Sequence, residues 1–72
     1  MITLHIIQER LIETIKQSNL TLTEIAKRIG VSQPTVSQYL SGRAMPALDT
    51  FARLCQVLDV PPDYLLGISD TF

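Results

Sequence analysis

The chain has 72 residues, 46% of them hydrophobic and 18% charged, and a formal net charge of −1. This length fits one domain near the lower limit for unaided folding, and a single cysteine, Cys55, excludes an internal disulfide and a cysteine-based metal site. No apolar run approaches the ~20 residues that cross a bilayer, and the slightly acidic total argues mildly against nucleic acid, whose phosphates favour a basic face.

The first predicted helix covers residues 4–18, where apolar residues recur at helical spacing. Its apolar stripe comprises Leu4, Ile7, Leu11 and Ile15, widened by Ile6 and Ile12. We expect this stripe to pack against the core of the domain.

Residues 22–41 are predicted to form two short helices joined by a turn. Thr21, followed three residues later by Glu24, is a capping box, so the first helix of the pair begins just after Thr21. Gly30 suits the left-handed backbone that ends this helix, because it has no Cβ. Ala26 is small enough to let the second helix cross closely over the first.

The N-cap of the second helix of the pair is either Ser32 or Gln33. Ser32 is a good N-cap, and Pro34 is tolerated in a first turn, but a proline also disfavours helical backbone at the residue before it. Gly42 is the expected left-handed terminator. The apolar contacts that fix the angle between the helices are predicted to be Ile25, Ile29, Val31, Val36 and Tyr39.

Two further helices are predicted after a loop at residues 43–46. The stripe of the longer one comprises Leu48, Phe51, Ala52, Cys55 and Leu58, and Asp49 near its start suits the helix dipole. A short last helix runs from Pro62 through Leu66, closed by Gly67. The pattern therefore predicts a compact all-α domain of five helices over residues 1–68, with a frayed tail at 69–72.

Residues 20–67 resemble the phage repressor and Cro-type helix-turn-helix family, which has the lambda repressor-like fold. The resemblance is carried by Leu20-Thr21, Glu24-Ile25-Ala26, Gly30-Val31-Ser32, Gly42 and Asp63-Tyr64-Leu65-Leu66-Gly67. It implies a helix-turn-helix at residues 22–41 whose second helix lies in the major groove of DNA. The chain departs from the family at Leu22, where members often have a glutamine that braces the first base-reading residue, and at Pro34, where a polar base-reading side chain is common.

The outward face of the second helix carries amides and hydroxyls but no charge. Glutamine can bind adenine through two hydrogen bonds, serine and threonine can bond to either strand, and a proline ring can rest on a thymine methyl. An ordinary solvated helix surface has a similar composition, but within a helix-turn-helix we favour base reading. The predicted base-reading residues are Gln33, Pro34, Thr35, Ser37 and Gln38.

A second set of residues is predicted to bind the DNA backbone and so to position the domain. These residues are Thr21, Thr23, Ser32, Ser41, Arg43 and Lys16. Four basic residues lie between Lys16 and Arg43 against Glu24 alone, whereas four aspartates follow residue 48 with only Arg53. Positive charge is thus concentrated around the motif, although Lys27 and Arg28 serve equally well as solubilising charges that complement their helix dipole.

Together with these patterns, the resemblance implies a cytoplasmic, sequence-specific regulator of transcription that binds double-stranded DNA, a repressor acting as a homodimer on a palindromic operator. The alternative is a protein-interaction module of the same fold, antitoxin-like or adaptor. The last helix and the tail supply an apolar surface for the dimer contact, made by Tyr64, Leu65, Ile68 and Phe72. In the alternative, Leu65 and Leu66 close the core and the tail is disordered. Neither an enzymatic site nor a site for a metal, cofactor or small-molecule ligand is predicted, because His5 and Cys55 lack catalytic or ligand partners at a useful spacing.

Overall fold

Five α-helices and no strand make up residues 1–71, the part of the chain that the computed structural model describes. The helices are α1 (Leu4–Gln17), α2 (Leu22–Ile29), α3 (Gln33–Ser41), α4 (Leu48–Val57) and α5 (Pro62–Leu65). The all-α class and the number of helices are confirmed. The helix pair α2–α3 occupies the predicted residues.

The boundaries of α2 and α3 are set by residues next to each helix end. The Thr21 hydroxyl accepts a hydrogen bond from the Glu24 amide at 3.1 Å, and a Glu24 carboxylate oxygen accepts one from the Thr21 amide at 3.2 Å. Gly30 follows α2 with φ of 79°, in the left-handed region. Ser32 is the N-cap of α3, so Gln33 is its first helical residue, which settles the open choice between them.

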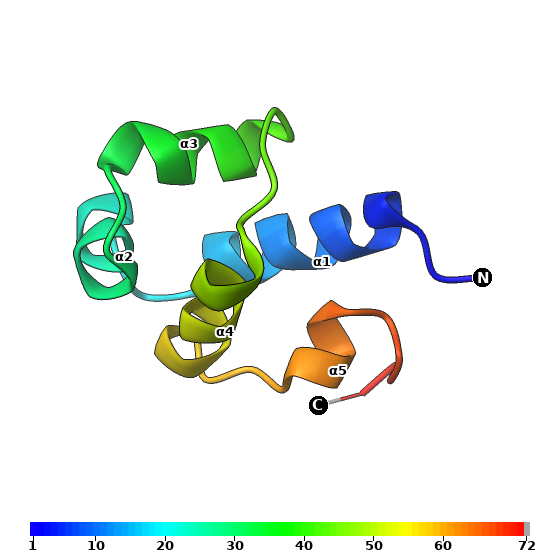
Figure 1. Cartoon of the computed structure of the whole chain (residues 1–72). Coiled ribbons are helices and arrows are strands. Elements are labelled where there is room, and N and C mark those ends of the chain that lie inside the picture. The colour runs from blue at the N-terminus through cyan, green and yellow to red at the C-terminus, as the bar shows by residue number, and fades with distance from the viewer. Residues whose placement is uncertain (72) are drawn as a thin grey trace.

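The helices place α3 on one side of the molecule. Figure 1 shows α3 above α1, with α5 on the other side of α1. The closest packing is between α2 and α3, and α4 packs against α2 from below. One long side of α3 is therefore left uncovered by the other helices.

The core joins all five helices around the helix pair. Its buried residues are Leu11, Ile15, Ile25, Ala26, Ile29, Val36, Tyr39, Phe51, Leu54, Cys55, Val60 and Leu65. The predicted apolar contacts of the helix pair are confirmed, with Val31 partly buried against the same cluster. Ala26 is 4% exposed in α2, the helix that packs most closely against α3.

The predicted apolar stripe of α4 was wrong by part of a turn. Leu48 is 85% exposed and Ala52 is also exposed, whereas Leu54 is fully buried. Phe51 and Cys55 belong to both the predicted and the observed stripe, and Leu58 packs against the core. The periodicity allowed two phases, and packing against α2 selected the one that includes Leu54.

The start of α1 also lies farther from the core than its stripe predicted. Leu4 is 69% exposed, whereas Leu11 and Ile15 are buried. The exposed side chains of Leu4 and Leu48 border a small apolar hollow together with Phe51 and Leu66. The first turn of α1 thus extends beyond the packed centre.

The last helix closes the core rather than forming a free apolar surface. Leu65 is fully buried, and Leu66 and Tyr64 are partly buried against the core. The prediction that Leu65 belongs to an exposed dimer surface was therefore wrong. Ile68 is 68% exposed. Phe72, the fourth residue of the predicted dimer surface, lies outside the described residues.

Arg10 fastens the end of the chain to α1. One guanidinium nitrogen donates to the carbonyl oxygens of Tyr64 and Ser69, both at 2.6 Å, and the other donates to Asp70 at 3.1 Å. The same group lies 4.5 Å from the centre of the Tyr64 ring, within the range of a cation–π contact. The prediction of a frayed tail at residues 69–72 did not anticipate these contacts at its start.

Replacing Arg10 with methionine is expected to lower the free energy of unfolding by about 2 kcal/mol, because hydrogen bonds from a charged group are the stronger ones. Arg10 is only 21% exposed, so water replaces these bonds incompletely. Urea denaturation followed by circular dichroism measures the loss. The matched control is Arg53→Met, because the Arg53 side chain is 51% exposed and its contacts are longer. Equal losses in the two variants would contradict this role of Arg10.

Candidate nucleic-acid interface

The uncovered side of α3 carries most of the residues predicted to read bases. Val36 and Tyr39 are buried and Leu40 is partly buried, which directs the opposite face of the helix to solvent. The exposed residues of this face are Gln33, Pro34, Ser37, Gln38 and Ser41. The face is therefore polar and uncharged, as the sequence predicted, and the major groove of DNA is wide enough to admit a single helix.

Thr35 lies at the edge of this face. Its side chain is partly buried, its amide donates to the Ser32 hydroxyl at 3.4 Å, and the two hydroxyl oxygens are 2.8 Å apart. Both side chains thus contribute to the start of α3. Each hydroxyl can make a further hydrogen bond, so their predicted contacts with bases and backbone are still possible.

The start of α2 lies next to the start of α3. The Thr23 hydroxyl donates to the Gln33 side-chain oxygen at 3.2 Å. Thr23 and Gln33 are both exposed, so the bond lies on the surface that α3 presents. Thr23 was predicted to bind the DNA backbone, and its contact with Gln33 was not predicted.

The capping box lowers the pKa of the Glu24 carboxyl group at the start of α2. Hydrogen bonds from the backbone amide and then the side chain of Thr21 hold the pKa of Glu24 below its ordinary value, so its carboxylate is ionised near neutral pH. The amides of Leu22 and Thr23 lie in the first turn, where N–H groups have no acceptor within the helix. These two amides are available to a phosphate, as expected for a helix N-terminus.

Arg43 follows α3 and is exposed, as its predicted contact with the DNA backbone requires. Its amide donates to the Gln38 carbonyl at 3.0 Å, across the left-handed turn at Gly42, where φ is 78°. The Gln8 side-chain amide of α1 donates to the Gly42 carbonyl at 2.9 Å. Gln8 therefore helps to position this turn, and no local pattern could reveal it, because the two residues are 34 positions apart.

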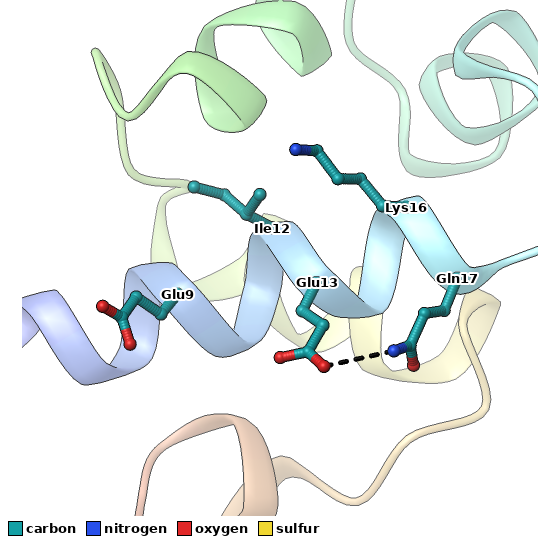
Figure 2. A pocket seen from close by; sticks show the side chains of 5 residues that line it. All are labelled: Glu9, Ile12, Glu13, Lys16 and Gln17. Atoms are coloured by element: carbon teal, nitrogen blue, oxygen red, sulfur yellow. Dashed lines mark hydrogen bonds between the residues drawn. The ribbon is translucent and has the colours of Figure 1, made fainter.

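Lys16 was predicted to contact the DNA backbone. It is exposed on α1, and its side chain lies on the side of α1 that faces α2 and α3 (Figure 2). In Figure 2, Lys16 and Ile12 extend from one side of α1 toward α2 and α3, whereas Glu13 and Gln17 extend the other way. The hollow drawn in Figure 2 is lined by side chains of α1 alone. It is an open helix surface and offers no enclosed site for a small molecule.

The described residues hold no group of three or more histidine, cysteine or acidic side chains placed to bind a metal ion. In the same part of the chain, no helix combines the length and apolar character needed to cross a membrane. Cys55 is buried, and burial raises the pKa of its thiol, which disfavours the nucleophilic thiolate. The surface of α3 is thus the strongest candidate site.

Comparison with known proteins places this arrangement in a family. A family model described as helix-turn-helix matches residues 11–65, which contain α2, α3, α4 and α5. The chain belongs to the phage repressor and Cro-type helix-turn-helix family. The resemblance noted in the sequence is therefore confirmed, and it extends to residues before Leu20.

Two curated relatives in this family illustrate the range of the match. YobD, an uncharacterized HTH-type transcriptional regulator of Bacillus subtilis, is 32% identical over 62 residues, covering 86% of this chain and 55% of YobD. RstR, the cryptic phage CTXphi transcriptional repressor of Vibrio cholerae, is 31% identical over 61 residues, covering 85% of this chain and 54% of RstR. The chain spans about half the length of these relatives.

A solved structure in the family matches most of this chain. The P22 c2 repressor protein, crystallised in complex with a synthetic operator, is 26% identical to this chain with a TM-score of 0.74. The match covers 89% of this chain and 97% of that one. The predicted lambda repressor-like fold is therefore confirmed.

Proposed function

We propose that this chain is a sequence-specific, double-stranded DNA-binding regulator of transcription, a repressor that inserts α3 into the major groove. The observation that carries the proposal is the exposed, uncharged face of α3, with Gln33 and Gln38 one to two turns apart on a helix held by a complete helix-turn-helix. The similarity to the P22 c2 repressor, solved with an operator, supports it.

The proposed partner is a palindromic operator bound by a homodimer in the cytoplasm. One domain offers few cations to phosphates, and of these only Arg43 and Lys16 are predicted to bind the DNA backbone, so a monomer would bind weakly. A dimer doubles these contacts and matches two half-sites separated by ~34 Å, one turn of the double helix. The buried Cys55 thiol is compatible with a reducing compartment.

The test is selection of duplexes from a randomised DNA pool at near-physiological salt, followed by sequencing of the bound fraction. The expected result is a site with two inverted halves, because a two-fold symmetric dimer reads the same sequence on both strands. Enrichment of a single half-site would support base reading but contradict the proposed homodimer. A pool without enrichment would contradict the proposal and favour the protein-interaction module, to which the uncharged face of α3 is also suited.

A further inference from the structure

The bond between Thr23 and Gln33 is the one side-chain-to-side-chain hydrogen bond that joins α2 to α3 within residues 1–71. It reaches Gln33 at the first position of α3, on the face proposed to read bases. The other contacts between the two helices are made by buried apolar side chains. A polar link at this exposed place contributes little to the core, so its effect falls on the side chain of Gln33.

We propose that Thr23 is a positioning residue that holds the Gln33 amide in the orientation required for base reading. This inference rests on the proposed function, because it concerns the same surface of α3. A glutamine side chain has three rotatable bonds, and its oxygen and nitrogen exchange places when the amide turns over. With the oxygen accepting from Thr23, the NH2 group is left to donate to a base edge, and one lone pair on the oxygen is still free.

The Thr23 side chain is well suited to hold another group in place. Threonine is branched at Cβ, so few rotamers are open to it in a helix. The capping box between Thr21 and Glu24 fixes the first turn of α2, to which Thr23 belongs. Gln33 is therefore ordered before DNA arrives, and less side-chain entropy is lost on binding.

This role differs measurably from the backbone contact predicted for Thr23. Loss of a phosphate contact weakens binding to all sequences about equally, whereas loss of a positioning contact changes the preference at a single base pair. The base pair in question is identified independently as the one that loses its preference in Gln33→Ala. Position-specific discrimination is thus the quantity to measure.

The experiment compares the wild-type protein with Thr23→Val and Thr23→Ser by duplex selection and by affinities for sites that differ at single base pairs. Valine keeps the branched shape without the hydroxyl, and serine keeps the hydroxyl. We expect Thr23→Val to reduce discrimination about threefold to tenfold at the Gln33 position alone, the range of one hydrogen bond. Thr23→Ser should retain the wild-type preference, and Thr23→Val added to Gln33→Ala should cause no further loss at that position.

Two results would overturn the inference and leave the proposed function intact: unchanged preferences in Thr23→Val, or equal weakening on every duplex. If the wild-type protein shows no sequence preference, both the inference and the proposed function are overturned. The preference of the wild-type protein is therefore measured first, before the variants are compared. Because Thr23 is exposed, Thr23→Val is expected to keep the wild-type circular dichroism spectrum and melting temperature.

Discussion

Leu54→Ala is expected to lower the free energy of unfolding by about 3 kcal/mol, because it leaves a cavity in a packed core. The Leu54 side chain is fully buried in the cluster that joins the helices, and its helix, α4, packs against α2. A domain of this size has a total stability of roughly 4–10 kcal/mol, so this one change removes a large part of it. Urea denaturation at 25 °C, followed by circular dichroism, gives the difference.

Leu48→Ala is the matched control, since it makes the same chemical change on the same helix. Leu48 is 85% exposed, so its replacement should alter stability by less than about 0.5 kcal/mol. The pair of variants therefore tests which face of α4 is buried. A larger loss from Leu48→Ala than from Leu54→Ala would show that the phase predicted from the sequence, and not the observed one, is correct.

Helix boundaries were predicted well because their causes are local. The capping box of Thr21 and Glu24 and the left-handed turns at Gly30 and Gly42 depend on residues within four positions of each helix end. The buried side of α3 was also predictable, because Val36 and Tyr39 recur at helical spacing within one short helix. Such local signals predict the folded structure well, because the hydrogen bonds and backbone angles at a helix end do not depend on packing against distant residues.

The contacts that depend on the tertiary fold were missed. Arg10 bonds to residues more than fifty positions away, and Gln8 to Gly42, and neither pair shows a pattern in the sequence. The bond from Thr23 to Gln33 spans the turn, so it depends on the crossing of α2 and α3. The face proposed to read bases was found from one helix, whereas the residues that hold it in place come from other helices.

Gln38→Ala is expected to reduce discrimination at one base pair by about 1–3 kcal/mol, or roughly 5-fold to 150-fold, the range for one bidentate contact. Gln38 is exposed near the middle of α3, and among the described residues its backbone carbonyl, not its side chain, bonds to the neighbouring turn. Its amide is therefore unused by the fold and available to a base edge. Affinities for the selected operator and its single-base-pair variants measure the change.

Gln56→Ala provides the control, since Gln56 is an exposed glutamine on α4 and lies outside the proposed surface. Gln56→Ala should discriminate between base pairs as the wild-type protein does. Both variants should have the melting temperature of the wild-type protein. If Gln38→Ala binds every duplex as the wild-type protein does, α3 does not read DNA through this residue. If it instead loses affinity equally for all duplexes, Gln38 acts on the DNA backbone, because only a contact with a base edge changes the preference at one position.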